Sequence, residues 1–305
     1  MSSAIQLDLI DFVERGGPAF ALIDGANCSA LSQITALERE SVSLYKRSIA
    51  IPQEVAPWLV PITTETTVEI LSLLPPDSHW GVLFHSDAPF TDLQAHFRRF
   101  TMVTLPGGSA PSYFRFYDPR VFTDALTALS PWRAAELCKP VNTIAVPASP
   151  VLNMSFDPLA PRLSFRGKVF ELAKPTQSEK GTGQRLQFLT PVEKAALDKL
   201  NYRRTGLKLA RDLQRAYPSA SHELIIYAAK MALRLGKAHA LTTVKELRVL
   251  GDCLIAYSGQ FPTSFPEARR ILDARPAERW QKGVWLREWL EQTRVQTVVS
   301  QKAMS

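Results

Sequence analysis

Hydrophobic residues follow two kinds of spacing along the chain, and the change comes near residue 190. Before it, short apolar runs typical of buried strands alternate with stretches whose apolar residues recur at helical spacing. The runs predict strands at residues 20–23, 80–84, 102–105, 112–117 and 143–146. Helical spacing predicts helices at residues 7–15, 29–41, 91–100, 121–129 and 131–137, and one that ends at Leu74. This order predicts a mixed sheet with helices packed on it, an N-terminal α/β lobe.

After residue 190 the pattern is helical. Thr190, Pro191 and Glu193 are typical of a helix start, with a cap, a proline at the first position and a glutamate at the third. Helices are then predicted at residues 191–216, 219–235, 242–257, 266–273 and 276–295. The fold class expected is therefore α+β, with an all-helical C-terminal lobe after the α/β lobe.

Proline divides the chain further, because 17 of the 22 prolines lie before residue 190. Between the two lobes, prolines separate short β-like pieces at residues 163–166, 169–172 and 185–189, and a polar stretch with glycine follows the second. We expect three segments: residues 1–147 as an α/β domain, 148–189 as a proline-rich linker with short strands, and 190–305 as a helical, basic lobe.

Charge is also divided unevenly. Residues 190–305 hold 20 Lys and Arg against 11 Asp and Glu, whereas residues 1–189 hold 16 against 18. A basic lobe suits an acidic protein or a nucleic acid as partner. The composition, 46% hydrophobic and 21% charged, excludes a disordered chain.

Location is expected to be cytoplasmic. The chain has no run of 18 apolar residues and no signal-like start, so neither a membrane span nor secretion is expected. The three cysteines are odd in number and form no CxxC, which favours a reducing compartment.

Residues 113–120 predict a strand that runs straight into a helix. Asp118 suits the N-cap and Pro119 the first helical turn. In a core-facing strand Arg115 needs an acceptor, because a buried unpaired charge is costly. Asp24 and Asp118 are the candidate partners. Two interpretations stay open: a structural ion pair, or a polar anchor at a strand end, where sites in open α/β sheets lie.

A catalytic centre is an alternative interpretation. Cys28 lies near a predicted helix start, where the pKa of a thiol can fall, and His85 and His96 would have to converge from a strand end and a helix. The histidines lack HxxxH or HExxH spacing, and GxGxxG and GxxxxGK[ST] are absent. We expect no catalytic residues, no metal and no cofactor, and keep a cysteine- or histidine-dependent hydrolase or transferase as the alternative.

The helical lobe carries two candidate protein-binding features. One is a basic stripe on a single helix face, formed by Arg204, Lys208, Arg211 and Arg215. The other is the pair Trp285 and Trp289, one turn apart on the last helix, although that helix can equally close the lobe's own core. A protein with an acidic patch is favoured over nucleic acid, because no nucleic-acid-binding signature accompanies the stripe.

Five stretches of the N-terminal half together resemble the family of cytosolic adaptor chaperones of the bacterial type VI secretion system, in both order and spacing. They are residues 21–26, 55–60, 80–83, 93–99 and 114–120. The resemblance marks six positions as structural or interface residues of the family motif: Asp24, Trp58, Arg115, Tyr117, Asp118 and Arg120.

This resemblance implies a non-enzymatic adaptor. Members of the family bind a toxic effector before secretion, help to load it onto the VgrG-type spike, and remain in the producing cell. The helical, basic lobe is a candidate surface for holding the effector, but the resemblance does not indicate which lobe contacts the effector and which the spike, and no membrane partner is expected.

Overall fold

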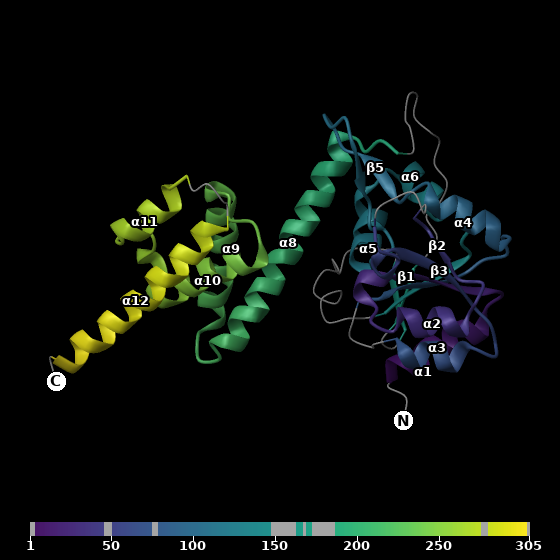
Figure 1. Ribbon diagram of the computed structural model, residues 1–305, viewed down its shortest axis with the longest axis horizontal. Coiled ribbons are helices and arrows are strands. Elements are labelled where there is room, and N and C mark those ends of the chain that lie inside the picture. The colour runs from purple at the N-terminus through teal and green to yellow at the C-terminus, as the bar shows by residue number, and fades with distance from the viewer. Residues whose placement is uncertain are drawn as a thin grey trace. The chain divides into compact units, whose positions relative to one another are not determined.

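The computed structural model describes residues 4–45, 51–74, 79–147, 163–166, 169–172, 187–275 and 280–303. The chain divides into two compact units, Met1–Leu200 and Asn201–Ser305. The first contains a sheet with helices and the second consists of helices (Figure 1), which confirms the predicted α+β class. Within the described residues, every helix is too short or too polar to cross a lipid bilayer.

A seven-stranded sheet forms the centre of the first unit. Its strands lie in the order β2-β3-β1-β4-β7-β9-β8. In that order their bounds are Val42–Ser43, Pro57–Ile62, Ala19–Asp24, Gly81–His85, Thr143–Pro147, Val169–Leu172 and Leu163–Arg166. Leu22, in the middle of β1, is paired with Leu59 on one side and Val82 on the other.

All neighbouring pairs among the described strands of this sheet are antiparallel, so the predicted mixed sheet is wrong in that respect. β3 and β4 are each antiparallel to β1 and therefore run parallel to one another, but β1 lies between them. The crossover through α3 (Thr67–Leu73) thus joins two parallel strands that are not neighbours. The order of elements in a sequence indicates strand direction but not which strands pair.

Helices cover both faces of the sheet (Figure 1). On one face lie α1 (Ala4–Arg15), α2 (Leu31–Leu37) and α3; on the other lie α4 (Phe90–Arg98), α5 (Pro119–Ala128) and α6 (Pro131–Leu137). Successive residues of a strand point to opposite faces. Ala21 and Ile23 of β1 accordingly enter the core under α1–α3, and Phe20 and Leu22 the core under α4–α6. Burial on both sides explains the uninterrupted apolar run of β1.

The strands predicted at residues 102–105 and 112–117 pair as a separate antiparallel hairpin of β5 (Met102–Thr104) and β6 (Pro111–Tyr113), although β6 ends before the expected residue 117. The strands predicted at residues 163–166 and 169–172 are confirmed as β8 and β9. Because β9 pairs with β7, they extend the main sheet of the first unit. Of the remaining predicted linker, the structure describes 187–189, which hydrogen-bond to Thr104. The rest lies outside the described residues.

The second unit is built from helices. They are α8 (Pro191–Ala216), α9 (His222–His239), α10 (Val244–Tyr257), α11 (Pro266–Asp273) and α12 (Gln281–Ala303). The sequence predicted the bounds of two of them, residues 191–216 and 266–273, and placed the other three less accurately. The boundary between the units falls inside α8, whereas the sequence predicted a boundary at residues 189–190. The start of α8 belongs to the first unit, where Leu197 packs against the core. Further along the helix, Leu209 and Leu213 are buried in the core of the second unit.

Candidate protein-binding sites

Asp24 and Arg115 form an ion pair in the first unit. Asp24 ends β1 and is fully buried, and its Oδ2 accepts a hydrogen bond from Nη2 of Arg115 at 2.5 Å. The second oxygen, Oδ1, is buried without a hydrogen-bond partner within the described residues. Burial raises the pKa of Asp24, and the positive charge of Arg115 offsets part of that rise. Of the two candidate partners of Arg115, Asp24 and Asp118, the structure shows Asp24.

The side chain of Arg115 is 42% exposed, so its predicted place in a core-facing strand is wrong. The backbone turns here: the N–H of Asp118 donates to the carbonyl of Arg115 at 2.9 Å. Phe114, Phe116 and Tyr117 are all buried, which an alternating strand would not allow. The turn points three aromatic rings inward and leaves the guanidinium at the surface.

Two residues that sequence reasoning missed complete this polar group. The hydroxyl of Tyr117 is 2.8 Å from that of Tyr45, and Asn27 donates to Asp24 Oδ2 at 2.7 Å. We call Asp24, Asn27, Tyr45, Arg115 and Tyr117 the Asp24 cluster. Burial and the hydrogen bond with Tyr45 raise the pKa of Tyr117 further above its usual range. Tyr45 is 72 residues from Tyr117 and follows no recognisable pattern, so nothing in the sequence indicated it.

Asp118, the other candidate partner of Arg115, has a different role. It caps α5 by accepting the backbone N–H of Arg120 at 2.9 Å, and it binds the guanidinium of Arg120 as well. The predicted N-cap and the proline at the first helical position are confirmed. Although burial raises the pKa of Asp118, the hydrogen bonds and charge of Arg120 lower it below its usual range.

Trp58 lies in β3, next to the strand that ends at Asp24. Its indole packs partly buried against the core under α1–α3, and Nε1 donates to the carbonyl of Gln53 at 3.0 Å. In register it is paired with Ile23, one residue before Asp24. Trp58 therefore supports the strand end from which the Asp24 cluster starts.

The three residues considered for catalysis, Cys28, His85 and His96, are buried, and both histidines are hydrogen-bonded to other residues. Cys28 is buried, and burial together with the charge of Asp24 raises the pKa of its thiol. His85 is hydrogen-bonded to Thr143 at 2.7 Å, and His96 to the carbonyl of Leu137 at 3.1 Å. Burial lowers the pKa of His96. Among the described residues, no three His, Cys, Asp or Glu side chains gather as metal ligands would.

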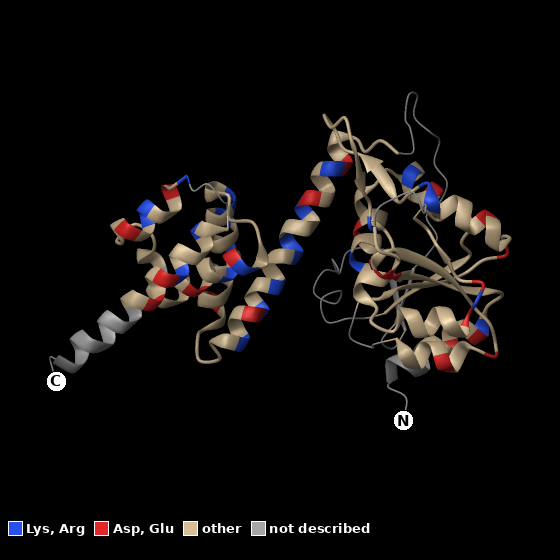
Figure 2. Cartoon of the chain, viewed as in Figure 1, with Lys and Arg blue, Asp and Glu red and all other residues tan. Residues whose placement is uncertain are grey.

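The predicted basic stripe lies on α8 in the second unit (Figure 2). Lys208 and Arg215 are exposed, and Arg204 and Arg211 are half-buried. With a rotation of about 100° per residue, these four positions lie broadly opposite Leu209 and Leu213, which the unit's core buries. The structure therefore presents the stripe on the outer side of its helix.

The two tryptophans predicted as anchors differ in their surroundings. Trp289 is 6% exposed and packs against the rings of Tyr257, Phe261 and Phe265 in the core of the second unit. Trp285 is 37% exposed. The interpretation that α12 closes its own unit thus holds for Trp289, whereas Trp285 has an accessible face.

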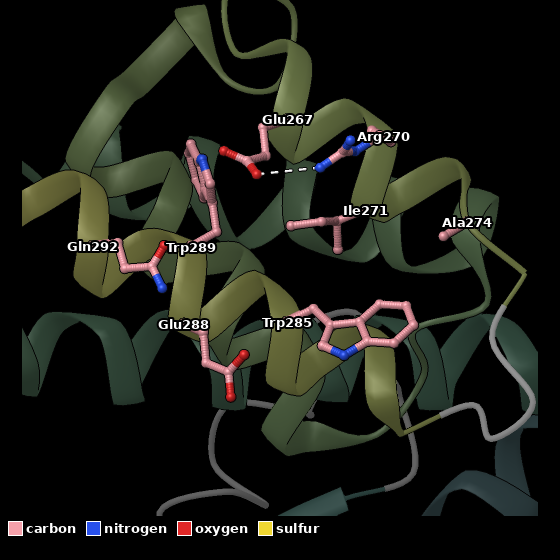
Figure 3. A pocket seen from close by; sticks show the side chains of 8 residues that line it. All are labelled: Glu267, Arg270, Ile271, Ala274, Trp285, Glu288, Trp289 and Gln292. Atoms are coloured by element: carbon pink, nitrogen blue, oxygen red, sulfur yellow. Dashed lines mark hydrogen bonds and ion pairs between the residues drawn. The ribbon is translucent and has the colours of Figure 1, made fainter.

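Both tryptophans line an open groove of about 470 Å³ between α11 and α12 (Figure 3). α11 contributes Glu267, Arg270, Ile271 and Ala274, and α12 contributes Trp285, Glu288, Trp289 and Gln292. Sequence reasoning found the α12 tryptophans from their spacing but not the α11 wall, because the two helices meet only in the folded unit.

A buried ion pair in the first unit was also missed. Glu193 Oε1 accepts from Arg133 Nε at 3.0 Å and from the backbone N–H of Ser130 at 2.9 Å, and Oε2 accepts from the N–H of Thr190 at 2.8 Å. Burial alone would raise the pKa of Glu193, but the hydrogen bonds from Thr190 and Ser130 and the charge of Arg133 lower it to about 2. The capping signature at Thr190 indicated the contact between Thr190 and Glu193 but not the contacts of Glu193 with Ser130 and Arg133.

These features define a two-unit α+β protein with a polar cluster at a strand end of one unit and an open aromatic groove in the other. Residues 19–136 match the family model described as a domain of unknown function (DUF4123). The matched span runs from β1 into α6 and contains the whole Asp24 cluster. No curated protein and no solved structure matches the chain.

Proposed function

We propose that the protein is a non-enzymatic adaptor of the type VI secretion system. It binds a toxic effector in the cytoplasm of the producing cell and promotes the loading of that effector onto the VgrG-type spike. The observation that carries the proposal is the family match over residues 19–136. That span holds every stretch on which the resemblance to the adaptor chaperones rests.

The chemistry of the candidate sites supports binding in preference to catalysis. The raised pKa of the Cys28 thiol disfavours the thiolate that a nucleophile needs. The imidazoles of His85 and His96 hydrogen-bond to structural partners. In contrast, Lys208, Arg215 and Trp285 are accessible, and arginine and tryptophan are enriched among the residues that dominate protein interfaces.

Co-expression of the full chain with the effector and the spike protein encoded beside its gene tests the proposal. We expect stoichiometric complexes that survive size-exclusion chromatography, with masses measured by light scattering. An effector from an unrelated secretion gene cluster is the matched control and should elute separately. If neither neighbouring product forms a complex with the chain, the proposal fails.

A second test follows export from the cell. In a strain that lacks this protein, we expect the effector to disappear from the medium while the spike protein is still released. Restoring the gene should restore effector export. Unchanged export in the deletion strain would contradict a loading role.

A further inference from the structure

The groove between α11 and α12 offers an apolar surface that the unit's own packing leaves accessible. Ile271 and Ala274 line it from α11, and the ring of Trp285 lies beside them from α12 (Figure 3). Trp289 forms part of the same wall but is anchored in the aromatic core behind it. Trp285 is thus the large aromatic side chain of the lining that a partner can cover.

The charges on the lining are not balanced. Glu267 is paired with Arg270 at 3.3 Å, whereas Glu288 is exposed and has no ion pair within the described residues. The uncompensated charge at this groove is therefore negative. A partner side chain that reaches Glu288 gains from carrying a positive charge.

The second unit as a whole is basic, with 18 Lys and Arg against 9 Asp and Glu in residues 201–305. This net charge acts on a partner at long range. At physiological ionic strength it is screened over about 8 Å, so the contact with Glu288 decides which charge is preferred inside the groove.

The groove geometry favours a helix as occupant. A groove between two helices suits the apolar face of a third, which presents anchors one turn apart. Trp285 and Glu288 are three residues apart on α12 and therefore neighbours on its surface. A helix lying along them matches this spacing with an apolar and a basic side chain one turn apart.

We propose that this groove binds an amphipathic helix of the effector. A large apolar side chain of that helix packs against Trp285 and Ile271, and a lysine or arginine one turn away faces Glu288. The inference rests on the proposed function for the identity of the partner, and names the chemistry by which the partner is recognised.

Two synthetic helical peptides of about 20 residues test the chemistry without the effector. Both carry leucine on one face, and one turn away the first has lysine and the second glutamate. Isothermal titration against the full chain should show the lysine peptide binding about 2–5-fold more tightly. Glu288→Lys should reverse this preference, while Glu223→Lys, at an exposed position of α9 outside the lining, should leave it.

Trp285→Ala should weaken both peptides by about 30-fold. The matched control is Trp280→Ala, because Trp280 is 60% exposed and does not line the groove. Circular dichroism checks that each variant is folded, and Trp285→Gln, which keeps a longer side chain and a good helix propensity, replaces Trp285→Ala if the latter unfolds. Equal affinity of the wild-type chain for the two peptides, or full binding by folded Trp285 variants, overturns the inference.

The same variants are then tested with the effector from the neighbouring gene. Loss of the effector complex in Trp285→Ala but not in Trp280→Ala supports the full inference. If the wild-type chain selects the lysine peptide and binds no effector, the groove chemistry stands and the proposed function fails. If the effector binds Trp285→Ala as well as wild type, the adaptor function stands and the effector helix lies elsewhere.

Discussion

The ion pair of Asp24 and Arg115 is asymmetric. Asp24 is fully buried and Arg115 is 42% exposed. Removing the arginine leaves a carboxylate in the interior without a counter-charge, whereas removing the carboxylate leaves a guanidinium that water can reach. The cost of breaking the pair therefore depends on which partner is lost.

We predict that Arg115→Ala lowers the free energy of unfolding of the first unit by about 3 kcal/mol. Asp24→Asn should cost less, since it removes the buried charge and keeps an acceptor for Arg115. The double variant should resemble Asp24→Asn alone. Urea unfolding of the three variants measures their free energies of unfolding and so their order of stability. If Arg115→Ala leaves the melting temperature unchanged but abolishes partner binding, Arg115 is a contact residue and not a structural one.

Glu193 should make the stability of the first unit depend on pH. Its pKa is lowered from 4.5 to about 2 in the folded state. A lowered carboxyl pKa gives stability that is present above pH 4.5 and is lost as the pH falls towards 2. The difference corresponds to about 3 kcal/mol. Urea unfolding of wild type and Glu193→Gln at several pH values measures the difference between their free energies of unfolding. This difference should shrink as the pH falls from 4.5 towards 2; a difference that does not change with pH would contradict the prediction.

At the scale of the elements, α9 ends in a strained residue. Ala240, directly after its last residue, has φ of 60° and ψ of 31°, the left-handed conformation that glycine adopts freely. We predict that Ala240→Gly stabilises the second unit by about 1 kcal/mol. Ala238→Gly, at an exposed position inside the same helix, should destabilise by about 1 kcal/mol. Thermal unfolding measures the melting temperature of each variant; a shift in the same direction for both variants would contradict this prediction.

Elements with local signals were predictable from the sequence. Asp118 and Pro119 predicted the start of α5, and Thr190 with Glu193 that of α8, because caps and first-turn prolines act within a few residues. The order of strands in the main sheet was not predictable, since the place of β1 between β3 and β4 depends on contacts distant in sequence. The turn after β6 was missed because closely spaced aromatics suggest a strand, even where the neighbouring residues Phe116 and Tyr117 are both buried.

The candidate sites follow the same division. An acidic partner for Arg115 was predicted because a charged residue among aromatics needs an acceptor, but the sequence did not decide between Asp24 and Asp118. Tyr45 and the α11 wall of the groove were missed, because only the folded chain brings them to Tyr117 and to Trp285. Periodicity locates side chains on one element and does not indicate which second element will face it.

Over the whole molecule, the net positive charge comes from the second unit, since residues 1–200 hold 18 Lys and Arg against 20 Asp and Glu, and residues 201–305 hold 18 against 9. If the effector is acidic, as we expect, its association with this protein should slow as salt is added. Lys208→Glu with Arg215→Glu should reduce the association rate about tenfold without changing the fold.

The control for this prediction has the same net charge. Arg203→Glu with Lys230→Glu changes two exposed positions outside the basic stripe. Stopped-flow association of the purified effector with each variant measures the rates. If both double variants slow association equally, overall charge and not the stripe steers the encounter.

Helix α8 also constrains how such proteins can exchange parts in evolution. A fragment that ended at the proline-rich segment would lose Glu193 and leave the buried guanidinium of Arg133 without its carboxylate. A recombination event that grafts a new helical unit must therefore carry the first turns of α8 with the sheet. If relatives exchange their helical units, the crossover points should lie in the middle of this helix and not in the loop before it.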